Sequence, residues 1–161
     1  DWEWYLDKAF MTRLGNTLRP DQVRAEDYVA IYFAGGHGVV WDFPDNAELQ
    51  ALSRNIYEAG GYVSSVCHGA VALLNIRLSD GSLLIQGKEV TGFTNEEEKL
   101  AGLDAHVPYL TETELRQRGA QFRQADAPWL PFAIADQRVI TGQNPASGGP
   151  VADLLLQALA A

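Results

Sequence analysis

Residues 62–70, which read YVSSVCHGA, are the stretch that determines the fold. An apolar, β-branched run ends at Val66 and a helix-like pattern begins at His68, so we predict a buried strand followed by a helix over about 68–76. Cys67, the single cysteine of the chain, lies at the turn. The unpaired amides and the dipole of a helix N-terminus favour a thiolate. We interpret Cys67 as a nucleophile; the alternative is a buried, inert thiol, which is the commoner fate of a lone cysteine.

Small residues on both sides of Cys67 suit the sharp turn of a nucleophile elbow. Gly69 follows the usual pattern, whereas Ser65 stands where that pattern has glycine. Working outward, residues 27–34 (DYVAIYFA) form a second apolar run, typical of a strand buried in a parallel sheet. This run leads into the loop Gly35-Gly36-His37-Gly38.

Ligands of open α/β sheets bind outside the carboxyl ends of the strands, so the glycine loop should lie beside the thiol. The backbone amides of Gly36 and His68 could then stabilise an oxyanion formed when Cys67 adds to a carbonyl. The alternative is that Gly35 and Gly36 only shape a turn. His68 is also placed to move protons near the thiol, unless it is merely the first residue of the helix.

The remaining pattern alternates strands and helices. It predicts βαβ units and a mostly parallel sheet within a single domain, 1–161. Residues 1–26 form a packed lead-in. Capping boxes are expected at Asp45 to Glu48, Asn95 to Glu98 and Thr111 to Glu114. Besides 27–34 and 62–66, the predicted strands are 88–93, 121–123 and 138–141, and the later helices start near 45, 95, 111 and 151.

Composition excludes several classes of protein. The net charge of −9 argues against nucleic-acid or anionic-membrane partners, because these require a basic surface. One cysteine rules out an intrachain disulfide framework and fits a reducing compartment, so a cytoplasmic location is the default. No stretch approaches the ~20 apolar residues that a membrane span needs.

An acid that orients His68 has to come from elsewhere in the chain. Glu96, Glu97 and Glu98 follow the predicted strand 88–93, whose carboxyl end should share the rim with Cys67. We nominate Glu98, although acids in a first helical turn also complement the dipole or complete a cap. His37 is interpreted as a loop residue with local hydrogen bonds, and His106 has no companion ligand. The histidines are too scattered to predict a metal site.

Four motifs occur in order: AGGHG (34–38), VCHGA (66–70), VTGFTN (90–95) and TGQNPAS (141–147). Together they resemble the ThiJ/PfpI superfamily, and within it the glyoxalase III/heat-shock-chaperone branch. The resemblance implies a flavodoxin-like, doubly wound α/β fold with helices on both faces, a reactive elbow cysteine and usually a homodimer. It also implies cofactor-independent conversion of methylglyoxal and related 2-oxoaldehydes into 2-hydroxy acids such as lactate. By motif, Cys67 would be the nucleophile, His68 the proton carrier and Glu98 the supporting acid.

The same resemblance implies a strand-helix-strand segment before residue 27, with a glutamate near the end of its first strand that contacts the cysteine. Glu3 and Glu26 stand in the wrong context for it. Without that strand, residues 28–34 would form an unpaired edge. We therefore expect the segment on a longer precursor or a companion chain, or another cover for the edge.

Other functions stay open at the level of sequence. A stress-associated chaperone or a thiol redox sensor would need no catalysis. A PfpI-like cysteine peptidase shares the Cys-His pair. A glutamine amidotransferase would need a distal His-x-Glu, and no histidine follows His106.

Overall fold

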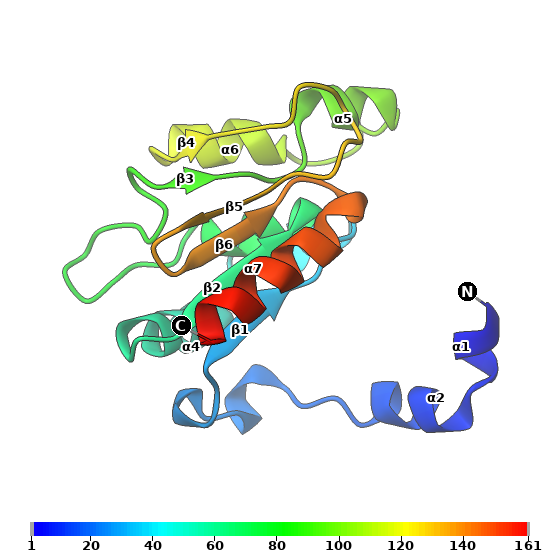
Figure 1. Ribbon diagram of the computed structural model, residues 1–161, viewed down its shortest axis with the longest axis vertical. Helices are drawn as coiled ribbons and strands as arrows, with labels where there is room; N and C mark the ends of the chain where they lie inside the picture. Colours follow the sequence, from blue (N-terminus) through cyan, green and yellow to red (C-terminus); the bar gives the residue numbers. More distant parts are fainter. Residues whose placement is uncertain (1, 161) are drawn as a thin grey trace.

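The computed structural model describes residues 2–160. Four strands form the main sheet in the order β1-β2-β6-β5, as Figure 1 shows. Strands β1, β2 and β6 are parallel, and β5 is antiparallel to β6. This confirms the predicted flavodoxin-like, mostly parallel α/β fold. The strand bounds are β1 Ala30–Phe33, β2 Tyr62–Val66, β5 Ala133–Asp136 and β6 Val139–Gly142.

Helices cover both faces of this sheet, and neighbouring residues of β2 contact them on opposite sides. The Tyr62 hydroxyl donates to the carbonyl of Ala158 in α7 (Gly148–Ala160), at 3.0 Å. The next residue, Val63, is fully buried in the same core cluster as Tyr57 of α4 (Ala47–Glu58). Figure 1 shows α7 in front of the sheet and α4 behind it.

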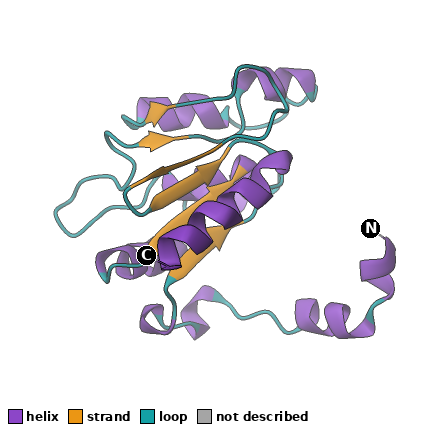
Figure 2. Cartoon of the chain, viewed as in Figure 1, coloured by secondary structure: helices purple, strands orange, loops and turns teal. Residues whose placement is uncertain are grey.

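A second, two-stranded parallel sheet pairs β3 (Glu89–Val90) with β4 (Gln121–Phe122). Side chains join it to the main sheet: the Glu89 amide donates to the Asp136 carboxylate, and the Thr91 amide donates to the Thr141 hydroxyl, both at 2.8 Å. Figure 2 shows it beside β5, next to two short helices. These helices are α5 (Asn95–Leu100) and α6 (Thr111–Gln117).

The predicted capping residues of α4, α5 and α6 are each wrong by one residue. Helix α4 is capped by Asn46, whose side chain accepts from the Leu49 amide, and not by Asp45. Helix α5 begins after Thr94, which forms the capping box with Glu97, so Asn95 and Glu98 do not pair as predicted. Helix α6 follows Leu110 without any side-chain cap. A cap requires an extended backbone at that one position, which the presence of a polar residue does not determine.

The chain after Cys67 also differs from the prediction. A 3₁₀ helix, Cys67–Leu73, replaces the predicted helix over 68–76. Several strands are shorter than predicted, β1 and β3 among them, whereas 62–66 is confirmed. Strand β5 and the short helix α3 (Val39–Asp42) were not predicted. Antiparallel β5 reads AIAD between a loop with two prolines and a tight turn, and this run is too short to be recognised as a strand from its apolar pattern.

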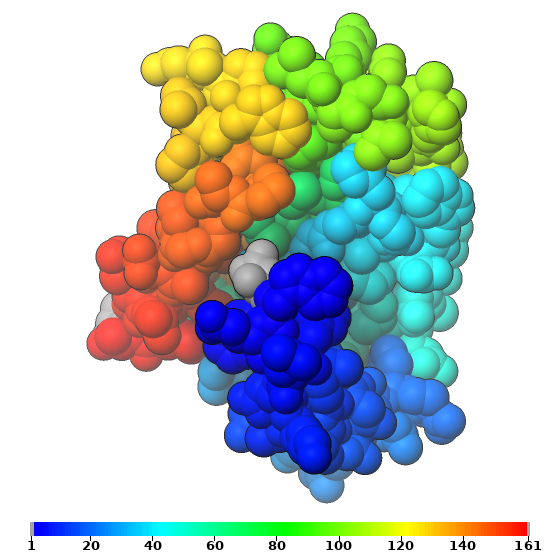
Figure 3. All heavy atoms as spheres, turned by 90° about the vertical axis from the view of Figure 1, so that its right-hand side faces the viewer, coloured from blue at the N-terminus to red at the C-terminus, as the bar shows by residue number. Residues whose placement is uncertain are grey.

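Residues 2–15 of the lead-in are not packed, contrary to the prediction, whereas the turns at Pro20–Gln22 and Ala25–Asp27 lie against α4. Helices α1 (Trp2–Leu6) and α2 (Lys8–Gly15) contain no buried residue, and Trp2 is 81% exposed. Figure 3 shows them projecting from the rest of the chain toward the viewer. Their aromatic side chains contact one another, Trp2 with Tyr5 and Trp4 with Phe10. The unpaired edge is also present: within the described residues β1 pairs with β2 alone, and Val29 beside it is 65% exposed. None of the described helices combines the length and apolar character of a membrane span.

Candidate active site

Cys67 lies on a strained turn at the carboxyl end of β2. Its φ is 59°, a value rare for a residue with a side chain and typical of a nucleophile elbow. Gly69 is required here, because a Cβ on it would lie 2.3 Å from the Phe33 carbonyl oxygen. Gly35 is required as well, because its Cβ would lie 2.8 Å from the Cβ of Cys67. The glycine loop after β1 therefore lies directly against the thiol, as the order of strands predicts.

Cys67, His68 and Glu98 form one hydrogen-bonded chain. The Cys67 Sγ lies 3.3 Å from His68 Nδ1, and His68 Nε2 lies 2.7 Å from Glu98 Oε2. His68 and Glu98 are almost completely buried, at 1% and 2% exposure. Glu98 can reach the histidine because the cap of α5 lies one residue earlier than predicted and is completed by Glu97, not Glu98. Glu96 is exposed and lies outside this chain.

Within residues 2–160 the surroundings of Cys67 favour the thiol over the thiolate, which differs from the predicted effect of the helix N-terminus. Burial raises the pKa of Cys67 to about 11. Hydrogen bonds from the backbone amides of His68 and Gly36 act in the opposite direction, while the nearby carboxylates of Glu97 and Glu98 add to the rise. The helix that follows Cys67 is a short 3₁₀ helix. Desolvation of the thiol outweighs the two amides, so the pKa of Cys67 is raised and not lowered.

His68 is a neutral imidazole in this environment. Burial lowers the pKa of His68, although the hydrogen bond to Glu98 opposes the shift. With Nε2–H donating to Glu98, Nδ1 presents a lone pair to the thiol. His68 can therefore accept the proton of Cys67 as a general base at the moment of attack.

His37 is part of the site, which corrects its interpretation as a loop residue with local hydrogen bonds. Its Nε2 lies 2.8 Å from Glu98 Oε1, across a sequence separation of 61 residues. The imidazoles of His37 and His68 lie 4.1 Å apart between centroids. His37 is the open member of the group, with a side chain that is 35% exposed. A contact over such a separation leaves no local signal in the sequence.

Two aromatic residues of the site were missed. The Phe93 ring lies 4.3 Å from the His68 imidazole, and Trp129 lies 5.6 Å beyond Phe93. Phe93 belongs to the VTGFTN motif, which is the one signal that could have identified it. Trp129 follows no motif and has a φ of 67°.

Glu97 forms a second network behind the first. Its carboxylate accepts hydrogen bonds from the Thr94 amide and hydroxyl, and from three groups of two later loops. Burial acts to raise the pKa of Glu97, but these hydrogen bonds outweigh it and hold that pKa below the ordinary value. Glu97 thus fixes the loops around the site. The three further donors, at 2.8–2.9 Å, are the Trp129 amide, Gln143 Nε2 and Asn144 Nδ2.

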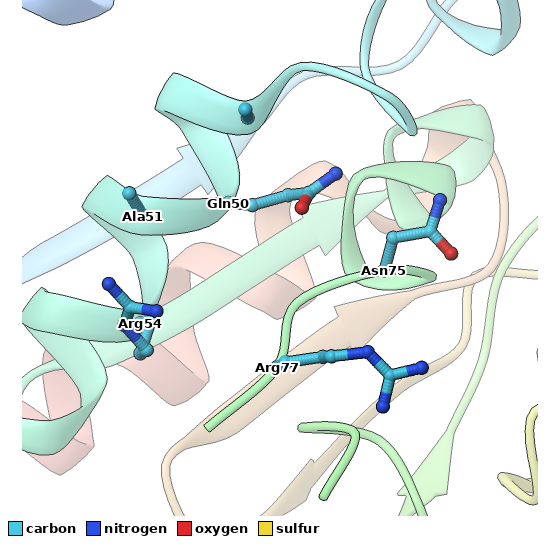
Figure 4. A pocket seen from close by; sticks show the side chains of 6 residues that line it. Gln50, Ala51, Arg54, Asn75 and Arg77 are labelled. Atoms are coloured by element: carbon cyan, nitrogen blue, oxygen red, sulfur yellow. The ribbon is translucent and has the colours of Figure 1, made fainter. Parts of the chain in front are cut away.

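A separate cavity of about 480 Å³ is lined by residues of α4 and by Asn75 and Arg77. None of the residues around Cys67 lines it. Figure 4 shows Gln50 extended toward Asn75, whereas Arg77 points away from Arg54. The two guanidinium groups do not converge, so this cavity lacks the paired cations that would hold an anion.

Comparison with known proteins adds a family. The sequence profile of the DJ-1/PfpI family matches residues 7–157. The glutathione-independent glyoxalase HSP31 of Saccharomyces cerevisiae is 34% identical over 158 residues, which cover 95% of this chain and 67% of that protein. A probable glutathione-independent glyoxalase of Schizosaccharomyces pombe, hsp3103, is 38% identical over 160 residues, covering 95% of this chain and 61% of that protein.

Among solved structures, glyoxalase III of Candida albicans matches with a TM-score of 0.89 and 31% identity. The match covers 98% of this chain and 69% of the other. The chain thus spans about three fifths to two thirds of the length of these two curated relatives.

Proposed function

The chain belongs to the DJ-1/PfpI family, and on that premise we propose that it is a glutathione-independent glyoxalase. It would convert methylglyoxal or a related 2-oxoaldehyde into a 2-hydroxy acid such as lactate, without a cofactor. The observation that carries this proposal is the buried chain Cys67–His68–Glu98, with Sγ 3.3 Å from an imidazole that can accept its proton.

The proposed chemistry needs no external oxidant. Sγ adds to the aldehyde carbon while His68 Nδ1 takes the thiol proton, and the amides of Gly36 and His68 stabilise the oxyanion. The hydrogen of the former aldehyde carbon then moves as a proton to the neighbouring carbonyl carbon. This gives a thioester of the 2-hydroxy acid, in which one carbon is oxidised and the other reduced. Water cleaves the thioester, so one water is consumed per product and the thiol is regenerated.

The proposal includes a strand that pairs with the edge of β1 and supplies the glutamate expected to assist the proton transfer. Within residues 2–160, His68 is the side chain that hydrogen-bonds Sγ. The exposed edge of β1 supports such a strand, from a preceding segment or a companion chain. In the native protein, slow exchange of the β1 amides that do not face β2 would support this cover, and fast exchange of those amides would contradict it. A homodimer and a cytoplasmic location are further parts of the proposal.

The test is lactate formation from methylglyoxal in the absence of glutathione. We expect Cys67→Ser to abolish it and His68→Gln to lower it by at least about a hundredfold. The matched control is His106→Gln, an exposed histidine outside the site, which should retain full activity. Because the chain has one cysteine, alkylation should inactivate it at a stoichiometry of one. Full activity of Cys67→Ser would refute the proposal.

The alternatives are separated by the same variants. A thiol redox sensor depends on reversible oxidation of Cys67, which should occur in the wild type without any lactate formation. A chaperone should hold unfolded clients equally well after Cys67→Ser. A PfpI-like peptidase should lose peptide hydrolysis in that variant, with no lactate formed by the wild type.

A further inference from the structure

Glu98 lies between two imidazoles that approach it from different loops. His37 Nε2 is 2.8 Å from Oε1 and His68 Nε2 is 2.7 Å from Oε2. The ligand atoms of the three residues all lie within 4.8 Å of one another. We propose that His37, His68 and Glu98 form a binding site for a divalent transition-metal ion, with Zn²⁺ as the best match to two imidazoles and one carboxylate.

The charge around the cluster favours a cation. Glu97 and Glu98 are both buried, at 0% and 2% exposure. Within residues 2–160, no lysine or arginine forms an ion pair with either carboxylate. Glu97 is compensated by five donated hydrogen bonds, but Glu98 has only the two imidazoles. Buried charges in proteins are usually paired or coordinate metals. The chain as a whole carries −9, which adds to the attraction.

The geometry needs only a small adjustment. Zn–N and Zn–O bonds of about 2.0–2.2 Å place tetrahedral ligand atoms roughly 3.3 Å apart. The two N···O distances, 2.8 and 2.7 Å, are shorter than this, and no two of the three ligand atoms lie more than 4.8 Å apart. His37 can adjust, since it lies in a glycine-rich loop and is partly exposed. The same exposure gives the ion a route in and leaves a fourth position for water, the arrangement of open zinc sites.

The thiol is not part of the ligand set. Sγ faces His68 Nδ1, whereas the ion would bind Nε2 on the other side of the ring. His106 is exposed and belongs to no such cluster. The proposed site therefore depends on His37 and His68 and not on His106.

Binding has a consequence for the thiol that rests on the proposed function. When Nε2 of His68 binds the ion, the neutral ring carries its proton on Nδ1. Nδ1 can then no longer accept the proton of Cys67. Zn²⁺ should therefore inhibit lactate formation, and a chelator should restore it.

The experiment is a titration of the native protein with Zn²⁺ against a chromophoric chelator. We expect one ion per chain in the wild type, and an affinity lower by at least about tenfold in His37→Gln, since losing even an outer partner of a ligand costs that much. The amide of that variant can still donate to Glu98, which preserves the network. His106→Gln and Cys67→Ser are the matched controls and should bind as the wild type does.

Three results would overturn the site: no binding by the wild type, unchanged affinity in His37→Gln, or equal loss in Cys67→Ser. Should His37→Gln fail to fold, Co²⁺ bound to the wild type decides, because a sulfur-to-metal charge-transfer band would mean that the thiol is the ligand. Binding is measured without turnover. Zinc binding without lactate formation would therefore refute only the proposed function, and lactate formation without zinc binding would refute only the site.

Discussion

Glu97 and Glu98 are neighbours in α5, both are buried, and they are surrounded very differently. Glu97 accepts five hydrogen bonds from amide and hydroxyl groups, none of which titrates near neutral pH. Glu98 contacts two imidazoles, one of them partly exposed. Burial alone therefore does not identify the chemical role of a carboxylate. The partners do: fixed donors make a structural anchor, and titratable partners make a reactive group.

The largest effect should come from Glu98→Gln. The amide keeps the volume of the side chain but no longer holds His68 as the tautomer with Nδ1 free, so glyoxalase activity should fall by about a hundredfold or more. The free energy of unfolding should change by about 1 kcal/mol or less, because only two hydrogen bonds are altered. Steady-state rates and urea unfolding measure both. A large loss of stability would show that Glu98 is also an anchor.

Glu97→Gln should show the reverse pattern. Its amide nitrogen would face at least one of five donors, which should lower the free energy of unfolding by about 2–4 kcal/mol. The rate per folded molecule should stay close to that of the wild type. Glu96→Gln, at the exposed neighbour, is the matched control and should be neutral in both measurements. Loss of activity at unchanged stability would show that Glu97 acts in the reaction and is not a structural anchor.

The pH dependence of the free energy of unfolding should further distinguish Glu97 from Glu98. The pKa of Glu97 is lowered in the folded state from its ordinary value of 4.5. Its contribution to stability is therefore complete above about pH 4.5 and is lost as the pH falls toward the folded pKa. Urea unfolding over acidic pH should show this loss in the wild type and a shallower one in Glu97→Gln. Equal slopes would contradict the assignment.

The smallest effect concerns the cap. Thr94→Ala removes the hydroxyl that accepts from the Glu97 amide and donates to its carboxylate, and should cost about 1 kcal/mol of unfolding free energy. Asn95→Ala, at the residue predicted as the cap, should cost less. The opposite order in thermal unfolding would show that the network does not depend on Thr94.

The sequence predicts the main part of this arrangement but not its finest level. The apolar runs around residues 30 and 62 predict parallel neighbouring strands, and therefore place Gly35 beside Cys67. Glu98, the acid that we nominate, lies within hydrogen-bond distance of His68, whereas the capping box lies one residue earlier than predicted and is completed by Glu97. Local pattern cannot resolve such a shift, because Thr94 and Asn95 are both good caps and only the backbone conformation distinguishes them.

Two features could not be predicted for a different reason. The contact of His37 with Glu98 joins loops of separate strands, and no residue spacing reports it. The raised pKa of Cys67 depends on how completely the surrounding chain excludes water, which is a property of the assembled fold. The catalytic roles of Cys67, His68 and Glu98 remain predictions until the variants are measured.

The wide spacing of the site residues along the chain has a consequence for folding kinetics. His37 and Glu98 are 61 residues apart, and Glu97 meets Asn144 across 47. Closing loops of this length costs conformational entropy before the contacts that stabilise the pair have formed, and this slows the formation of such pairs. We expect both carboxylate networks to assemble late, after the hairpin of β5 and β6. During refolding, the rate at which Cys67 becomes protected from alkylation would then measure the rate of this last step.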